Sequence, residues 1–451
     1  MQNTAYHAAC SALKRLNAAG HEAYLVGGCV RDRLMGRVPN DYDITTSALP
    51  QQVKDVFADL HTIDTGLAHG TVTVMVDGFP TEITTYRTES GYSDSRHPDR
   101  VEFVRSLKED LARRDLTVNA MAMDSAGNVH DYFGGEADLR AGLLRAVGDA
   151  DARFTEDPLR MLRTLRFAAK LGFSIEPQTE AALYRNREKL TLVAMERIRE
   201  ELIGLLMGDS AGRVLAEHFT VLCVFMPQLL PMQDMPQHNP HHIHDLLHHT
   251  AAVVDAAPKD PSLRLAAFFH DCAKPACFSL DEKGVGHFYG HAQKSAALAD
   301  ELLRQLKAGN ALREEVCTLV AGHDDPMPLS DKVVRKRLSK YGETRFFRLL
   351  QLKEADDRGK APDTMQQGLA HIHQLRETAA RLLKTEGCIT LRTLAVNGGD
   401  LAAMDYSGKE IGKALQSLLN RVLEGKLANS RDALLAAAKR NAPKKSAQVR
   451  E

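Results

Sequence analysis

The chain has 451 residues, of which 44% are apolar and 26% are charged, and these are ordinary values for a globular protein of two to four domains. It contains no run of about 18 apolar residues that would predict a membrane span, and residues 1–16 lack the pattern of a signal peptide, so a cytoplasmic protein is expected. The formal net charge of −1 neither favours nor excludes a nucleic-acid partner, because basic side chains can gather on one face.

The first 145 or so residues alternate strand and helix signals, and this alternation predicts an α/β domain. Strands are predicted at 23–27, 41–46, 70–76 and 79–87, and helices at 30–35 and 50–60. The pair Asp77-Gly78 stands between the last two strands and is typical of a tight hairpin turn.

From Asp149 onward the strand signals fade and helical spacing dominates. Helices are predicted at 157–171, 177–189 and 194–207, a Pro/His/Met-rich connection at 227–242, and further helical segments over 239–360 and 363–439. The predicted domains are a head at 1–146, a helical neck at 147–235, a histidine-rich domain at 236–360, a helical tail at 361–440 and a basic disordered tail at 441–451.

Two glycines and two aspartates form the first functional motif of the head. Gly27 and Gly28 stand between a predicted strand and helix, where glycine lets backbone amides approach a phosphate closely. Asp41 and Asp43 are two apart on a predicted strand, so both carboxylates are expected on one face. A pair of Mg²⁺ ions would offset their repulsion, activate an attacking hydroxyl and hold a departing pyrophosphate. Either motif alone is common in solvated turns, whereas their order within one strand–helix–strand unit is specific.

This order of motifs resembles the signature of class II tRNA nucleotidyltransferases and bacterial poly(A) polymerases. The matching segments are 25–32 (LVGGCVRD), 41–46 (DYDITT), 109–120 (EDLARRDLTVNA), 156–160 (EDPLR), 162–167 (LRTLRF) and 196–202 (ERIREEL). The similarity is specific over residues 20–210 and weaker over much of the remainder. It implies an α/β nucleotidyltransferase head with a small mixed sheet, followed by a mostly α-helical neck, an HD domain and a helical tail that binds tRNA.

Roles for individual head residues follow from the resemblance. It implies that Asp41 and Asp43 bind Mg²⁺, and that Glu82 on the partner strand is a candidate third carboxylate, with a surface strand residue as the alternative. The residues implied to contact the nucleotide are Gly27, Gly28 and Arg31 at the triphosphate, Asp32 as support of that loop, Arg113, Arg114 and Asp115 at the sugar and phosphates, and Asn119 as their support.

Selection of the nucleotide base is expected to lie with Asp157 and Arg160, which are three apart on a predicted helix and so share a face. A carboxylate and a guanidinium offer an acceptor and paired donors that match the Watson–Crick edges of cytosine and adenine. An intrahelical salt bridge is the alternative, but the resemblance implies a protein template for CTP and ATP. Arg163 and Arg166 continue the helix and are expected to face the nucleotide or the RNA backbone.

Two related activities share these motifs. The stretch 82–101 resembles the flexible loop of tRNA nucleotidyltransferases, and the segments 394–401 and 408–412 resemble their tails, which favours CCA addition over poly(A) synthesis. A poly(A) polymerase or an enzyme that adds only A remains an alternative, as does a nucleotide-sensing or RNA-binding protein with a degenerate head. The expected partners are tRNA, CTP and ATP, with no membrane, and the oligomeric state is left open.

A second set of potential metal ligands lies in the histidine-rich domain. Histidine and aspartate together ligate transition metals such as Mn, Co, Ni or Fe. The pattern resembles the HD phosphohydrolase domain, which implies four core ligands, two completing histidines, and Lys274 at a substrate phosphate. The implied ligands are His249, His270, Asp271 and Asp356, with His291 and His323 completing a two-metal site. Because 19 histidines allow chance clusters, a scaffold without activity is the alternative.

Overall fold

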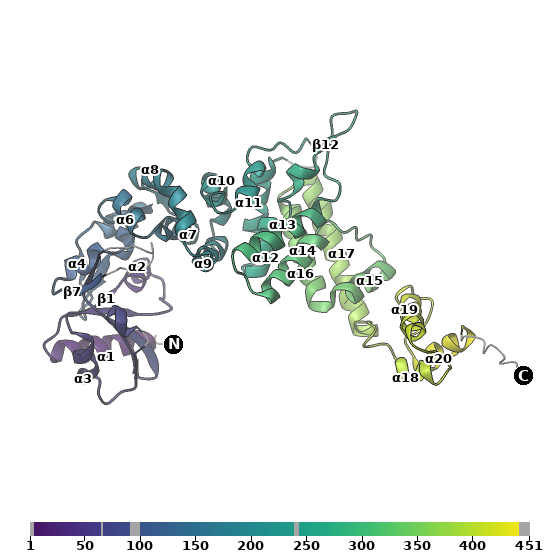
Figure 1. Ribbon diagram of the computed structural model, residues 1–451, viewed down its shortest axis with the longest axis horizontal. Coiled ribbons are helices and arrows are strands. Elements are labelled where there is room, and N and C mark those ends of the chain that lie inside the picture. The colour runs from purple at the N-terminus through teal and green to yellow at the C-terminus, as the bar shows by residue number, and fades with distance from the viewer. Residues whose placement is uncertain (1–3, 65, 91–99, 239–242, 442–451) are drawn as a thin grey trace, which may run out of the picture. The chain divides into compact units, whose positions relative to one another are not determined.

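The computed structural model describes residues 4–64, 66–90, 100–238 and 243–441 (Figure 1). The chain forms two compact units, the first comprising Met1–Leu230 with Gln305–Ala308 and the second Pro231–Arg304 with Gly309–Glu451. Three predicted segments lie partly outside the described residues: the centre of the flexible loop (91–99), the end of the connection (239–242) and all but the first residue of the basic tail (442–451). Within the described residues, no helix combines the length and the apolar composition needed to cross a membrane.

A seven-stranded sheet forms the centre of the first unit. Its order is β3 (Thr62–Ile63), β4 (Thr71–Val76), β5 (Phe79–Thr85), β2 (Asp43–Thr46), β1 (Ala23–Val26), β8 (Met121–Met123) and β9 (Val129–Asp131). Strands β2 and β5 run parallel and the other neighbours run antiparallel, so the sheet is mixed. The predicted α/β head with a small mixed sheet is confirmed.

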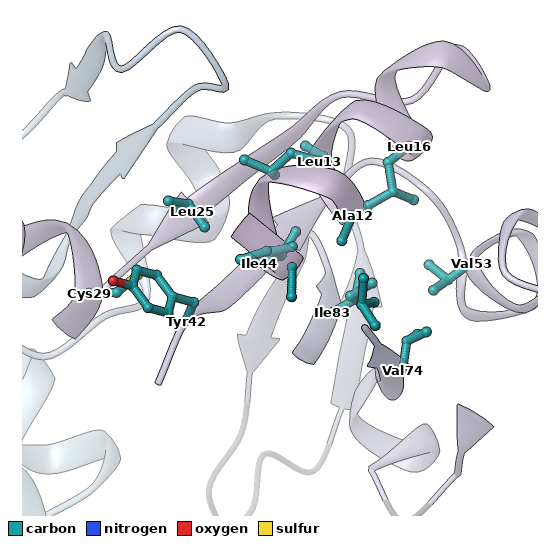
Figure 2. Close-up of a cluster of buried hydrophobic side chains, with 14 of the residues drawn as sticks. Ala12, Leu13, Leu16, Leu25, Cys29, Tyr42, Ile44, Val53, Val74 and Ile83 are labelled. Carbon is teal, nitrogen blue, oxygen red and sulfur yellow. The ribbon is translucent and has the colours of Figure 1, made fainter. Parts of the chain in front are cut away.

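Helix α1 (Thr4–Ala18) packs against this sheet and supplies part of its core. Its Leu13 and Leu16 are fully buried and cluster with Leu25 of β1, Ile44 of β2 and Ile83 of β5 (Figure 2). Strand residues of this core alternate with residues of the opposite face, as the period of two requires. Burial of each large aliphatic side chain contributes roughly 1.5–3 kcal/mol, so this core fixes the strands that carry the candidate site.

Two local features differ in how well the sequence predicted them. Asp77 (φ 50°) and Gly78 (φ 82°) both have positive φ, as a tight two-residue turn requires, so the predicted hairpin between β4 and β5 is confirmed. The strand predicted from residue 41 begins at Asp43, and Asp41 and Tyr42 lie before it. The prediction that both aspartates lie on one strand was therefore wrong.

Helices continue the first unit beyond the head, and the helix predicted from residue 157 begins at Leu159. They are α6 (Ala150–Glu156), α7 (Leu159–Leu171), α8 (Pro177–Asn186), α9 (Met195–Leu206) and α10 (Ala211–Leu222). Asp157 follows the end of α6 in an extended conformation (φ −136°, ψ 100°), because the ring of Pro158 disfavours a helical residue before it. The prediction that Asp157 and Arg160 share one helix was wrong.

The second unit is mostly helical. Its helices are α11 (Leu246–Ala256), α12 (Pro261–Phe269), α13 (His291–Gln305), α14 (Asn310–Gly322), α15 (Asp331–Tyr341), α16 (Glu343–Arg358) and α17 (Pro362–Glu386), followed by α18 (Gly398–Ala402), α19 (Lys409–Leu423) and α20 (Arg431–Arg440). The last three helices share an apolar core that includes Leu401, Leu419 and Leu434. A short hairpin of β12 (Ser279–Leu280) and β13 (Gly286–His287), which the sequence did not predict, precedes α13.

Candidate active site and a second candidate metal centre

Carboxylates gather on the first unit's sheet where β2 begins. Ile44 of β2 pairs with Ile83 of β5 in parallel register, and continuing this register by one residue places Asp43 beside Glu82. Because alternate strand residues share a face, Asp43 and Glu82 point to the same side of the sheet. Asp41, two residues earlier, is exposed like both of them.

The negative charges of these three carboxylates affect the pKa of Asp43. Loss of solvent around its carboxylate, followed by the negative charges of Asp41 and Glu82, raises the pKa of Asp43 to about 6, although the residue as a whole is exposed. Repulsion of this kind is relieved by a bound divalent cation, and carboxylate oxygens suit Mg²⁺. Among the described residues, three potential metal-ligand atoms lie within 4.8 Å of one another only in the second unit. The three carboxylates of the head are therefore more widely spaced than this.

The glycine loop lies between β1 and helix α2 (Gly28–Leu34). Gly27 has φ 80° and ψ −131°, a backbone conformation that disfavours residues with a side chain. A Cβ placed on Gly27 would lie 3.0 Å from a terminal guanidinium nitrogen of Arg114. The loop and the predicted nucleotide-binding arginine therefore meet, and the positive φ of Gly27 favours glycine at this position.

Several predicted site residues form one hydrogen-bonded network behind this loop. Arg31 is 2% exposed; its Nε donates to Asp32 Oδ1 at 2.8 Å and its Nη1 to Asn119 Oδ1 at 2.6 Å. Asn119 Nδ2 in turn donates to Asp115 Oδ1 at 3.2 Å, and Arg163 Nε donates to Asp115 Oδ2 at 2.9 Å. Burial alone would raise the pKa of Asp115, but the Arg163 charge and the Asn119 hydrogen bond hold it below its ordinary value. Arg31 thus stabilises the glycine loop through its hydrogen bonds to Asp32 and Asn119.

Sequence reasoning missed Asp110, which anchors both predicted nucleotide-binding arginines. The buried carboxylate of Asp110 accepts hydrogen bonds from Thr45 Oγ1 at 3.0 Å and from Arg113 Nε at 3.0 Å, and Arg114 lies 3.8 Å away. It also accepts a hydrogen bond from the backbone N–H of Arg87 at 3.2 Å. The signal was present in the sequence, because Asp110 precedes the two arginines by three and four residues in and just after helix α4 (Leu107–Ala112).

The side chains of Asp157 and Arg160 do not pair with each other, although the backbone N–H of Arg160 donates to the Asp157 carbonyl at 3.0 Å. Asp157 Oδ2 lies 2.9 Å from a guanidinium nitrogen of Arg197 on α9. Arg160 is 8% exposed, and its guanidinium donates to Glu156 Oε2 at 2.8 Å and to the carbonyl of Arg113 at 3.0 Å. Arg197 and Glu156 therefore orient the two residues predicted to select the base. Glu156 directly precedes Asp157 in the chain, whereas Arg197 lies in the motif at 196–202, and nothing in that motif predicted its pairing with Asp157.

Arg163 and Arg166 on α7 are both engaged in ion pairs. Arg166 Nε lies 2.5 Å from Glu201 Oε2 on α9, and its guanidinium stands over the Phe167 ring at 4.5 Å. Arg163 joins Asp115 and lies 3.8 Å from Glu201. These contacts join α7 to α9 and to the head, and a role toward nucleotide or RNA stays a prediction.

All six predicted ligands of the histidine-rich region come together in the second unit. Five of them form two overlapping sets that share one carboxylate, namely His249, His270 and Asp271, and Asp271, His291 and His323. Asp271 Oδ2 lies 3.1 Å from His270 Nε2, whereas Asp271 Oδ1 lies 3.2 Å from His291 Nε2. Asp356 joins the first set, with its Oδ1 3.1 Å from His249 Nε2. Asp271 thus stands between two groups of ligands.

The four histidines are oriented in the same way. Each Nδ1 contacts a backbone carbonyl, at 3.1 Å for His249, 2.7 Å for His270, 2.9 Å for His291 and 2.7 Å for His323. A proton on Nδ1 satisfies these contacts and leaves the Nε2 lone pair facing the centre, as in metal-ligating histidines. All four imidazoles are buried, so their orientation is fixed by the helices that carry them.

The donor set fits a divalent transition metal. Asp271 Oδ1 is buried and accepts no hydrogen bond from the described residues, and the Nε2 atoms of His249 and His270 face each other at 3.4 Å. Acceptor atoms that face one another in a buried site are costly unless a cation lies between them. Lys274 Nζ lies 2.7 Å from Asp271 Oδ2 and supplies one positive charge. The cluster opens into a cavity of about 290 Å³ that Lys274 and Lys360 also line.

The mixed sheet, the glycine loop and the carboxylates define a nucleotidyltransferase head, and family models agree with this class. A model described as the poly A polymerase head domain matches residues 23–145. A probable RNA- and SrmB-binding site of polymerase A matches residues 172–232, and a putative tRNA nucleotidyltransferase domain 2 matches residues 287–438.

Relatives define the family more closely. The CCA-adding enzyme of Limosilactobacillus fermentum is 37% identical over 428 residues, which are 94% of each chain. That of Lactobacillus johnsonii is 54% identical over 207 residues, and the chain spans about half the length of this and similar relatives. The structure of the Bacillus stearothermophilus CCA-adding enzyme in complex with CTP aligns with a TM-score of 0.71 and 29% identity over 98% of both chains. The chain belongs to the CCA-adding enzyme family.

Proposed function

We propose that the first unit adds CMP and AMP, taken from CTP and ATP, to the 3′ end of tRNA and so synthesises or repairs the CCA end without a template. One observation carries this proposal: Asp43 and Glu82 lie side by side on parallel strands of the head that also holds the glycine loop packed against Arg114. Family membership supports the choice of substrate, because relatives are CCA-adding enzymes and one was solved with CTP.

The residues of the head have distinct tasks in this reaction. Mg²⁺ bound by Asp41, Asp43 and Glu82 would activate the tRNA 3′-hydroxyl and stabilise the departing pyrophosphate. The bond from the 3′-oxygen to the α-phosphorus forms as the bond from that phosphorus to pyrophosphate breaks, and the hydroxyl proton passes to solvent. Arg114 lies against the glycine loop and provides positive charge for the triphosphate, while buried Arg31 keeps the loop in shape.

Base selection is assigned to Asp157 and Arg160, each held by a different neighbour. Arg197 orients the Asp157 carboxylate, and Glu156 orients the Arg160 guanidinium. Held in this way, the carboxylate and the guanidinium would present an acceptor and donors to the edge of a cytosine or an adenine. A rigid template of this kind discriminates against bases whose edges leave these groups unpaired.

The proposal is tested with tRNA that lacks its last three nucleotides, supplied with CTP, with ATP, or with both. We expect two additions with CTP alone, three with both, and almost none with ATP alone. Long adenylate tails on RNA without a tRNA fold would identify a poly(A) polymerase instead. Addition of a single A only to tRNA that already ends in CC would identify an A-adding enzyme.

A second function is favoured by Asp271, whose two oxygens face two separate sets of histidines. We propose that the second unit is an HD domain that hydrolyses phosphomonoesters or 2′,3′-cyclic phosphates with a transition metal such as Mn, Co, Ni or Fe. The bound metal would lower the pKa of a water molecule and place it near phosphorus. A new P–O bond forms with that water, the P–O bond to the alcohol breaks, and the water proton passes to the leaving oxygen. Hydrolysis by purified protein loaded with each metal tests this function.

A further inference from the structure

Aromatic side chains line one wall of the cavity that contains the metal-ligand cluster of the second unit. His287, Phe288 and Tyr289 follow one another along the chain, beginning in β13, and all three line the cavity together with Asp271 and His291. Tyr289 is 79% exposed. The hairpin labelled β12 in Figure 1 extends beyond the helices of its unit. The exposure of Tyr289 leaves this part of the wall open to a ligand.

Two of these rings are stacked on each other and held in place by the hairpin. The rings of His287 and Tyr289 lie 5.3 Å apart between centroids and only 6° from parallel. His287 Nε2 lies 3.1 Å from Asp281 Oδ2, and its Nδ1 lies 3.4 Å from the Tyr289 hydroxyl. Asp281 in turn accepts hydrogen bonds from two backbone N–H groups of the hairpin turn. The hairpin thus holds the stacked pair in place without a ligand.

The hairpin is also tied to the ligand cluster. Lys274 Nζ lies 2.7 Å from Asp271 Oδ2, 2.8 Å from Gln237 Oε1 and 5.1 Å from the centre of the Phe288 ring. A Cβ on Gly286 would lie 2.3 Å from the carbonyl oxygen of Gln237, so the hairpin packs directly on this segment. The aromatic wall therefore has a defined position relative to Asp271.

We propose that the stacked His287–Tyr289 pair binds the nucleobase of a nucleoside phosphate whose phosphate group reaches the Asp271 cluster. Tyr289 is two residues from His291, at most about 7 Å of extended backbone, which suits a ligand the size of one nucleotide. Every nucleobase has a π-face, so such a platform favours nucleotides over aliphatic phosphate esters without selecting one base. This inference rests on the proposed HD hydrolase and assigns the residues that select its substrate.

The platform is tested by hydrolysis of adenosine 3′-monophosphate and of glycerol 2-phosphate by Mn²⁺-loaded protein. Stacking predicts that Tyr289→Ala lowers kcat/KM for the nucleotide at least roughly tenfold and leaves glycerol 2-phosphate unchanged. Tyr289→Phe should retain most of the preference, because the ring remains. Leu280→Ala is the matched control, since Leu280 is 54% exposed on the same hairpin and does not line the cavity. An equal effect on both substrates, or none, would overturn the proposal.

Further measurements separate the platform from the hydrolase and identify the source of the nucleotide. If neither compound is hydrolysed, the hydrolase fails, and calorimetry with the Mn²⁺-loaded protein still tests the platform. Adenosine 3′-monophosphate should then bind at least roughly tenfold more tightly than inorganic phosphate, and Tyr289→Ala should remove that advantage. The same titration with Asp271→Ala protein, which lacks the metal cluster, measures how much of the nucleotide binding is due to the head. Comparing the binding of an RNA oligonucleotide that ends in a 3′-phosphate with that of adenosine 3′-monophosphate shows whether the ligand is an RNA end or a free nucleotide. Equal binding of phosphate and nucleotide would contradict the inference.

Discussion

The two candidate metal sites of this chain are built in opposite ways. In the head, Asp41, Asp43 and Glu82 are exposed and do not form a closed set of ligands. In the second unit, Asp271 and four histidines are buried, and every histidine is oriented by a backbone carbonyl. Mg²⁺ is usually held by one or two carboxylates plus substrate phosphates, whereas imidazole sites bind transition metals on their own. The head is therefore expected to bind its metal together with the nucleotide. The second unit is expected to bind its metal before any substrate arrives.

The largest expected effect comes from the head. Asp43→Ala should lower nucleotide addition by about a thousandfold or more, because metal ligation stabilises the phosphoryl-transfer transition state by several kcal/mol. Binding of tRNA, measured by filter retention, should stay near wild type. Asp55→Ala removes an exposed carboxylate from α3 (Pro50–Val56) and serves as the control. Normal incorporation by the Asp43 variant would refute the two-metal assignment.

The converse substitution sharpens the comparison. Asp271→Ala removes the carboxylate shared by both ligand sets, so phosphate-ester hydrolysis should fall to background while CCA addition remains. The Asp43→Ala protein should show the reverse pattern. Both activities are measured on the same preparations. Loss of both activities in either variant, with an unchanged melting temperature, would show that the two sites are not independent.

A smaller effect is expected on nucleotide choice. Asp157→Ala or Arg160→Ala should raise incorporation of UTP or GTP relative to CTP and ATP by roughly tenfold to a hundredfold, because half of the hydrogen-bonding template is lost. Arg185→Ala breaks an exposed ion pair with Asp151 elsewhere in the neck and is the control. Unchanged selectivity with a lower melting temperature would mean that Asp157 and Arg160 only stabilise the structure through Arg197 and Glu156.

The smallest effect concerns stability and pH. The pKa of Asp115 is held below its ordinary value by Arg163 and Asn119 despite the opposing effect of burial. A carboxylate with a depressed pKa stabilises the folded state above its unfolded pKa of about 3.9, and this contribution is lost as pH falls further. Asp115→Asn should therefore lower the melting temperature at pH 7 by several degrees, and the gap should narrow below about pH 4. A gap that does not change with pH would rule out the charge as its cause.

The sequence predicted the head's mixed α/β fold because its longer strands alternate clearly. It did not predict β3, β8, β9 or the β12–β13 hairpin, because strands of two or three residues carry too little periodicity. Pro158 indicated that the helix would not include Asp157, but the helical spacing of the following residues led to a prediction that included it. The ligand types of the second unit were evident from motifs, and the structure brings all six residues together.

Partners contributed by distant elements were harder to find. Asp110 had a helical spacing to its two arginines, yet its contact with Thr45 depends on how β2 packs against α4. Arg197 reaches Asp157 from a helix forty positions later, so only the fold reveals that pair. Contacts of this kind join distant parts of the chain, and local periodicity carries no information about them.

The contrast between a substrate-completed head and a preformed second site is tested most directly by metal analysis of protein purified without nucleotides. Elemental mass spectrometry after exhaustive dialysis should find one or two Mn, Fe, Co or Ni ions per chain in wild type and in Asp43→Ala, and none in Asp271→Ala. Tightly held metal that is lost in Asp43→Ala, or wild-type protein reconstituted with these metals that retains none, would contradict the account.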